Sequence, residues 1–126
     1  MKAMEASENY LETILMVHRS IGNVRSVDIA NALGYSRPTI SIVMKKFQED
    51  GYVEIDRDGY ITLQEKGRAI AERMYERHVI IAKVLMSLGV DEEAALTESC
   101  KIEHDISEKT FECIKAYYLK MGSSAK

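Results

Sequence analysis

The feature that most constrains the fold is a pair of short predicted helices joined by a tight turn. The first is expected over residues 27–33, with Ser26 as its N-cap and Gly34 closing it, because glycine readily adopts the left-handed conformation of a helix C-terminus. The second is expected over 36–49, opening at Ser36 as N-cap with Pro38 at the first helical position. Two helices joined by so short a turn are typical of a helix-turn-helix.

A β-hairpin is predicted directly after this pair. Two β-prone runs, 52–55 and 60–63, flank Asp-Arg-Asp-Gly at 56–59, which has the composition of a hairpin turn. A further amphipathic helix is expected before the pair, over 5–19, and it stops before Gly22. We therefore expect a winged helix-turn-helix domain over residues 1–63.

Residues 64–126 are expected to form an all-helical domain, which makes the fold mainly α. Predicted helices cover 64–87, 91–104 and 107–121, with Asp91 and Ser107 as N-caps of the last two. Three helices rich in apolar residues are more than is needed to cover the wing. Helix-turn-helix proteins usually place two recognition helices about one duplex turn apart, so we predict a dimerisation domain and a homodimer.

Charge restricts how such a chain can contact DNA. The 126 residues carry a net charge of −3, so any attraction to phosphate must come from a local surface. Residues 36–48 contain no acidic residue, although the whole chain is acidic. The candidate DNA-contacting residues lie in or near this segment and at the wing tip: Ser36, Arg37, Pro38, Thr39, Ser41, Lys46 and Arg57.

These candidates have different expected roles. Arg37 is placed to contact guanine with two hydrogen bonds, whereas Ser36 and Lys46 are better placed for phosphate. Arg57 at the wing tip is expected at the minor groove or the backbone. The alternative is that these charges form an ordinary solvated helix face.

Neither a membrane nor a secreted setting is expected. No apolar run approaches the length of about 20 residues that spans a bilayer, and no signal peptide opens the chain. Two cysteines are too few for a disulfide-stabilised secreted scaffold, so reduced thiols and a cytoplasmic location are predicted. Cys113 is expected in the core.

A second cluster suggests metal chemistry. Cys100, Glu103 and His104 fall on one face of a predicted helix and offer a thiolate, a carboxylate and an imidazole. His78 interrupts the apolar stripe of the long predicted helix and needs a hydrogen bond or a ligand if buried. The alternatives are a small apolar cysteine, solvated charges and an ordinary partly buried histidine.

At these residues the chain resembles the diphtheria-toxin-repressor family of metal-dependent repressors, which includes the manganese transport regulators. The resemblance covers the whole chain, in a two-domain form like the manganese regulators, without the SH3-like third domain of the iron-dependent members. It is carried by residues 7–12, 28–30, 77–78 and 88–91, and most specifically by 98–107. It implies these metal ligands: Asn9, Glu12, His78, Cys100, Glu103 and His104.

Two of these residues depart from the family pattern. Asn9 stands where the manganese regulators have Asp and the iron-dependent members have Met, although its amide oxygen also suits a hard cation. Cys100 matches the iron-dependent type, whereas the manganese regulator has Glu there. The resemblance implies Mn(II) or Fe(II) as co-repressor, and Zn(II), Co(II) or Ni(II) are expected to substitute in vitro because affinity follows the Irving-Williams order.

The expected function is a metal-dependent repressor of metal-homeostasis genes. It would bind a two-fold-symmetric operator in double-stranded DNA, with metal aligning the two recognition helices of the dimer. The alternative is a winged-helix regulator with a structural Zn site or with redox sensing through Cys100. An enzyme is not expected, because no oxyanion donors accompany Cys100 and His104.

Overall fold

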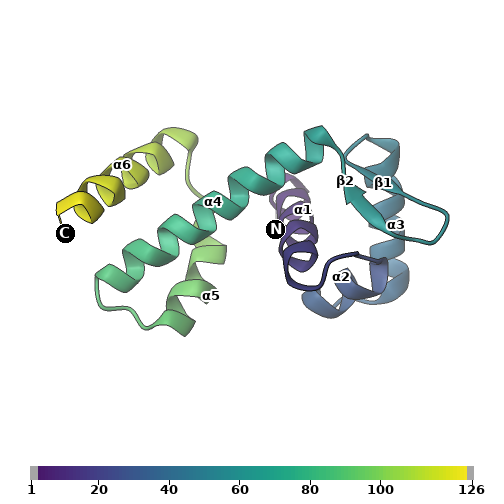
Figure 1. The fold of residues 1–126 in the computed structure, drawn as a ribbon, viewed down its shortest axis with the longest axis horizontal. Coiled ribbons are helices and arrows are strands. Elements are labelled where there is room, and N and C mark those ends of the chain that lie inside the picture. Colours follow the sequence, from purple (N-terminus) through teal and green to yellow (C-terminus); the bar gives the residue numbers. More distant parts are fainter. Residues whose placement is uncertain (1–2, 125–126) are drawn as a thin grey trace. The chain divides into compact units, whose positions relative to one another are not determined.

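The computed structural model describes residues 3–124, which form two compact units (Figure 1). One unit ends at Arg73 and the other begins at Met74, so the division falls inside the long helix α4. The described elements are α1 (Ala3–Ile21), α2 (Ser26–Leu33), α3 (Arg37–Glu49), β1 (Val53–Ile55), β2 (Ile61–Leu63), α4 (Glu65–Ser87), α5 (Glu92–Ile102) and α6 (Glu108–Ser124). This order confirms the predicted mainly helical, winged helix-turn-helix fold.

The first unit is built around an apolar core shared by its helices and its hairpin. Helix α2 packs against both α1 and α3, while the strands contact α3 and α1. Apolar side chains of all three helices are almost fully buried, among them Leu11, Ile14, Ile29, Ile40 and Met44. The buried residues fix which face of α3 packs into the core, and the opposite face is exposed.

The turn between α2 and α3 has the expected chemistry, with two changes in detail. Gly34 adopts φ 73°, and Ser36 caps α3 by accepting from the Thr39 N–H at 3.3 Å. Pro38 is the second residue of α3 rather than the first. Arg25, not Ser26, is the N-cap of α2, because the Asp28 carboxylate accepts from the Arg25 backbone N–H.

The hairpin forms the predicted wing. Strands β1 and β2 pair antiparallel, with Val53 opposite Leu63. At the turn, the Asp56 side chain accepts from the backbone N–H groups of Asp58 and Tyr60, both at 2.9 Å. The sequence did not reveal an extra bridge, in which the Ile61 N–H donates to the Val24 carbonyl oxygen at 2.7 Å.

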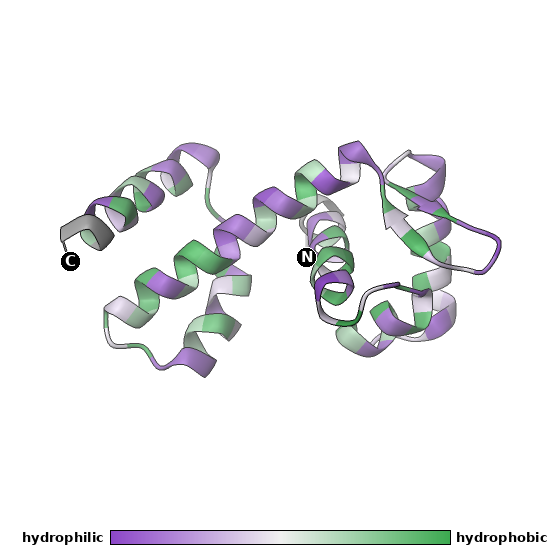
Figure 2. Ribbon diagram, in the orientation of Figure 1, coloured by the Kyte–Doolittle hydropathy of each residue, from purple (hydrophilic) through white to green (hydrophobic). Residues whose placement is uncertain are grey.

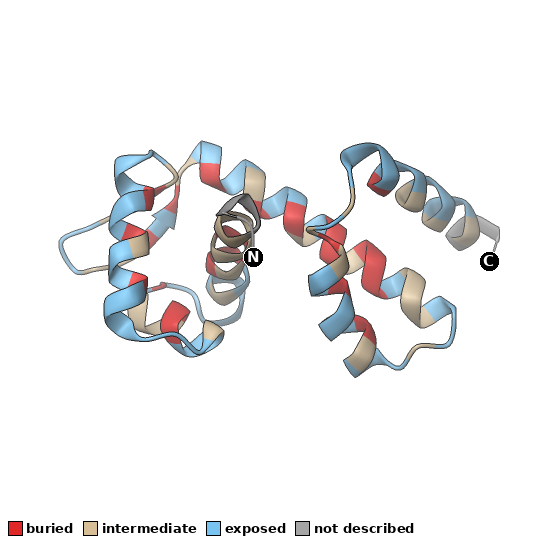
Figure 3. Cartoon of the chain, turned by 180° about the vertical axis from the view of Figure 1, so that it is seen from behind, coloured by how far each residue is buried: buried red, intermediate tan, exposed pale blue. Residues whose placement is uncertain are grey.

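The second unit comprises the rest of α4 together with α5 and α6. Its buried apolar residues include Met74, Ile81 and Ala82 on α4, Ala95 on α5 and Phe111 on α6 (Figure 3). The prediction that Cys113 lies in the core is wrong, since this cysteine is exposed. It lies about 200° around α6 from the buried Phe111, because each residue advances a helix by about 100°.

An ion pair links α6 to α4 within the second unit. The Lys115 ammonium donates to the Glu76 carboxylate at 2.9 Å, and this hydrogen bond raises the pKa of Lys115. Polar and apolar residues alternate along α4 in Figure 2. Among the described helices, none is both long and apolar enough to cross a membrane.

Candidate metal centre and DNA-binding surface

Three donor side chains of different chemistry meet in the second unit. His78 comes from α4, Cys100 from the last turn of α5, and Glu103 from the residue that follows α5. Their donor atoms all lie within 4.8 Å of one another. Sulfur, nitrogen and oxygen donors are thus gathered as the sequence predicted for these three residues.

Glu103 is at the centre of this group. Its carboxylate is fully buried and faces one imidazole with each oxygen: Oε2 lies 3.4 Å from His78 Nδ1 and Oε1 lies 3.4 Å from His104 Nε2. His78 Nδ1 also lies 3.5 Å from Cys100 Sγ. The structure therefore brings together four of the six predicted ligands.

The donor set fits a divalent metal ion. Ligand atoms about 2.1 to 2.3 Å from one ion lie about 3 to 3.8 Å apart, and the separations of His78 Nδ1 from Glu103 Oε2 and from Cys100 Sγ are of this size. His104 faces the other carboxylate oxygen of Glu103. A buried carboxylate is costly unless opposite charge offsets it, which a cation would supply. The mixture of donors suits borderline metals such as Fe(II), Co(II) and Zn(II), while its carboxylate also suits Mn(II).

Helix α5 ends earlier than the sequence predicted, yet the donors still share a face. The helix stops at Ile102, and His104 lies in the following turn. Glu103 keeps a helical backbone (φ −59°, ψ −26°), and its N–H donates to the Ser99 carbonyl oxygen at 2.9 Å. The helical spacing from Ser99 to Glu103 is therefore preserved, which keeps Glu103 on the side of Cys100.

Two residues that the sequence did not single out hold this cluster in place. Ser99 is fully buried, donates to the Leu96 carbonyl oxygen, and has its Oγ 2.9 Å from His78 Nδ1. This contact holds the imidazole with Nδ1 facing Cys100 and Glu103, and a metal ion bound at Nδ1 would replace the hydrogen bond. The sequence offered one indication of this supporting role, because Ser99 is the residue next to Cys100.

Arg77 is the second supporting residue. Its buried guanidinium donates to the carbonyl oxygens of Glu103 at 2.9 Å and Ile106 at 3.0 Å, and to the Glu108 carboxylate at 3.1 Å. It also lies 5.3 Å from the centre of the Phe111 ring. One side chain of α4 thus fixes the turn that carries Glu103 and His104.

The other two predicted ligands, Asn9 and Glu12, lie on α1 in the first unit. They are one helical turn apart and so share a face of that helix. Glu12 is almost fully buried. The backbone carbonyl oxygen of Asn9 accepts from the Thr13 hydroxyl at 2.8 Å. Their role as ligands stays a prediction.

The predicted DNA-contacting residues are all exposed. They occupy the start of α3, its outer face and the hairpin turn, as Ser36, Arg37, Pro38, Thr39, Ser41, Lys46 and Arg57. The Ser36 and Thr39 hydroxyls lie 2.8 Å apart, and Lys46 lies 3.6 Å from Asp50 on the following turn. Such exposed pairs are weak, so Lys46 remains available to phosphate.

A further exposed cation lies beside the wing. Arg25, which precedes α2, stacks 4.3 Å from the centre of the ring of Tyr60, the residue before β2. Sequence reasoning missed it because the contact joins residues far apart along the chain. It adds positive charge to the surface around the hairpin.

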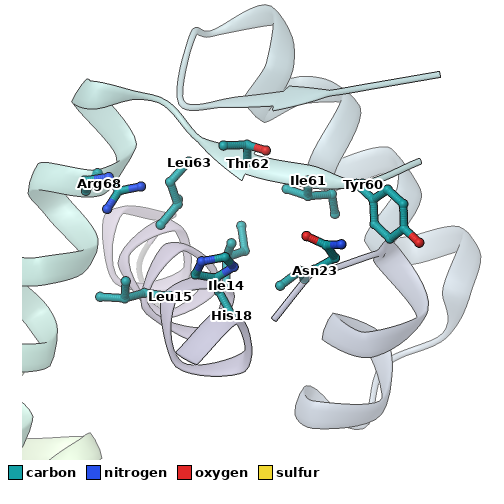
Figure 4. A pocket seen from close by; sticks show the side chains of 10 residues that line it. Ile14, Leu15, His18, Asn23, Tyr60, Ile61, Thr62, Leu63 and Arg68 are labelled. Carbon is teal, nitrogen blue, oxygen red and sulfur yellow. The ribbon is translucent and has the colours of Figure 1, made fainter. Parts of the chain in front are cut away.

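The first unit also contains a small pocket of about 60 Å³ between α1 and β2 (Figure 4). Ile14 and Leu63 line it, and His18 and Arg68 contribute polar edges. His18 Nδ1 donates to the Gly22 carbonyl oxygen at 2.9 Å. No carboxylate or thiol is among the described lining residues, and the volume fits a few water molecules rather than a metal site.

A winged helix-turn-helix followed by helices that gather S, N and O donors around a buried carboxylate defines a metal-responsive DNA-binding regulator. Comparison with known proteins agrees. Residues 2–61 match the N-terminal DNA-binding domain of iron-dependent repressors, and residues 64–123 match the metal-binding and dimerisation domain of the same proteins. The chain belongs to the iron-dependent repressor family, which confirms the resemblance seen in the sequence.

Individual relatives are transcriptional regulators rather than enzymes. The chain is 32% identical to the transcriptional regulator MntR of Escherichia coli O157:H7 over 119 residues, covering 94% of this chain and 77% of that protein. It is also 32% identical to MntR of Bacillus subtilis strain 168 over 100 residues, covering 79% and 70% respectively.

Solved structures show the same architecture. A manganese-dependent transcriptional repressor in complex with manganese is similar with a TM-score of 0.81 and 28% identity, covering 89% of this chain. The manganese regulator SloR is similar with a TM-score of 0.74 and 25% identity, covering 88% of this chain. The chain spans about half the length of these two, 52% in each case.

Proposed function

We propose that this protein is a homodimeric repressor whose affinity for its operator is raised by Mn(II) or Fe(II). The observation that supports this best is the buried Glu103 carboxylate, which faces two imidazoles in the domain that follows the winged helix. A cation there would act as a signal, since the chain's relatives regulate transcription.

The proposed ligand set joins the two domains. His78, Cys100, Glu103 and His104 would supply the donors of the helical domain, and we propose that Asn9 and Glu12 supply oxygen donors from α1. Because α1 belongs to the DNA-binding domain, ligands shared in this way would restrict the orientation of each recognition helix. In a dimer, this restriction sets the spacing between the two helices, which must match the operator. We place the functional boundary between residues 63 and 64, at the start of α4.

Manganese and iron are the proposed physiological metals. The similar repressor structure contains manganese, and SloR is described as a manganese regulator. Carboxylate and amide oxygens favour Mn(II), whereas the Cys100 thiolate favours softer ions such as Fe(II). Zn(II), Co(II) and Ni(II) are expected to bind in vitro because intrinsic affinity follows the Irving-Williams order.

The proposed DNA target is a two-fold-symmetric operator in double-stranded DNA near genes of metal homeostasis. A homodimer presents two identical recognition helices, so a matching operator repeats its half-site with the same symmetry. We propose that Arg37, Thr39 and Ser41 approach base edges, while Ser36 and Lys46 bind phosphate. Pro38 would pack beside them and Arg57 would approach from the wing, in a repressor located in the cytoplasm.

Removal of metal tests this function against a structural zinc site. An operator is first selected from random DNA with the Mn(II)-loaded full chain. After chelation, we expect the protein to stay helical by circular dichroism and dimeric by sedimentation but to lose operator affinity. Loss of a structural zinc would instead unfold the helical domain.

Variants then test the ligands under anaerobic conditions with Mn(II), Fe(II) and Zn(II). Glu103→Gln and His104→Ala should abolish the metal-dependent gain, because each removes a donor of the cluster. Glu98→Gln is the matched control, since Glu98 is an exposed carboxylate on α5. A wild-type gain in Glu103→Gln would contradict the proposed site.

A further inference from the structure

Ile42 is an unusual residue on the recognition helix. Along α3, which the structure describes completely, the large apolar residues Ile40, Met44 and Phe47 are buried in the core, whereas Ile42 is 71% exposed. It lies near the middle of the helix, on the side away from this core. Its burial in the folded monomer therefore contributes little to stability.

The side chains around Ile42 on the surface are either basic or smaller than isoleucine. Pro38 and Thr39 lie one turn earlier on α3, and Lys45 and Lys46 lie one turn later. All four are exposed. Ile42 is thus an exposed apolar side chain within the surface that we propose binds DNA.

We propose that Ile42 determines operator specificity by packing against the C5-methyl group of a thymine in the major groove. This inference rests on the proposed DNA-binding function. The thymine methyl is the distinctive apolar feature of the major-groove edge, and apolar side chains are its usual partners. The hydroxyl and basic groups around Ile42 suit base edges and phosphates, and the apolar surfaces of Pro38 and of the Thr39 methyl group are smaller than that of Ile42.

Duplex DNA is a better occupant of this surface than a second protein. One isoleucine beside two lysines offers far less apolar area than a stable protein interface, which buries about 800 Å² on each partner. The lysines favour a polyanion. The combination of isolated apolar side chain and flanking positive charge therefore points to DNA.

A chemical double-mutant cycle tests this contact. Each thymine of the selected operator is replaced in turn by deoxyuridine, which removes only the methyl group, and affinity of the Mn(II)-loaded full chain is measured by fluorescence anisotropy. At one thymine position of the half-site we expect an affinity loss of about fourfold for the wild type, the effect of losing one buried methyl. With Ile42→Ala, the same replacement should have no effect.

Controls separate this role from others. Gln48→Ala changes an exposed residue at the far end of α3 and should retain the full methyl effect. Ile42→Ala should leave the urea midpoint and the sedimentation coefficient unchanged. The proposal is overturned if Ile42→Ala keeps the wild-type methyl effects, or if it weakens binding only by changing the oligomeric state. Failure to select any sequence-specific operator would overturn the proposed function itself and this inference with it.

Discussion

At the scale of the residue, the sequence predicted the donor side chains of the candidate metal centre but not the residues that support them. Helical spacing placed Cys100 and Glu103 on one side of a helix, and the structure agrees because Glu103 keeps a helical backbone after α5 ends. Arg77 and Ser99 act through contacts with a carbonyl oxygen and a ring nitrogen. Such contacts depend on how helices pack, which spacing within one helix does not reveal.

Cys100 should influence the choice of metal. Cys100→Glu replaces a soft thiolate with a hard carboxylate, so we expect the affinity for Mn(II) relative to Zn(II) to rise at least several-fold. Competition binding with a chromophoric chelator measures this ratio. Cys113→Ser serves as the control, because Cys113 is exposed on α6 and outside the donor group. An unchanged ratio in Cys100→Glu would exclude Cys100 from the ligand set.

At the scale of the element, the sequence predicted all six helices and the hairpin, with shifts of a few residues at the ends. The caps at Asp91 and Ser107 are confirmed, since their side chains accept from the N–H groups of Ala94 and Thr110. The bridge between Val24 and Ile61 was missed. A single paired residue has no periodic pattern, so only the folded chain reveals it.

Gly67 lies inside helix α4 at a position where the packing against Tyr52 should make alanine less stable than glycine. Glycine inside a helix usually costs about 1 kcal/mol relative to alanine. Here a Cβ would collide with the backbone carbonyl oxygen of Tyr52, which also accepts from the Gln64 N–H at 2.9 Å. We expect Gly67→Ala to lower the free energy of unfolding by about 1 to 2 kcal/mol, because overpacking outweighs the gain in propensity.

Urea denaturation measures this effect. Ala69→Gly, an exposed change on the same turn, should also destabilise by about 1 kcal/mol through ordinary helix propensity. Gly67→Ala adds a methyl group and Ala69→Gly removes one, yet both substitutions should lower the free energy of unfolding. A Gly67→Ala protein that is more stable than the wild type would show that α4 moves away from Tyr52 without cost.

At the scale of the whole molecule, the helical domain leaves apolar side chains uncovered. Its described residues with large, exposed apolar side chains are Leu88, Leu96, Tyr117 and Leu119. Because this domain is the dimerisation domain of the family, a second copy of the chain offers cover for such residues. The sequence predicted dimerisation from the excess of apolar helices, but it did not identify which residues stay exposed in one chain.

We infer that metal binding and operator binding are coupled through the dimer. The most direct test is the dissociation constant of the wild-type dimer for its operator, measured by anisotropy without metal and at saturating Mn(II). With typical coupling of about 1 to 3 kcal/mol per site, we expect Mn(II) to tighten binding by several-fold to more than a hundredfold. Equal dissociation constants under the two conditions would contradict it.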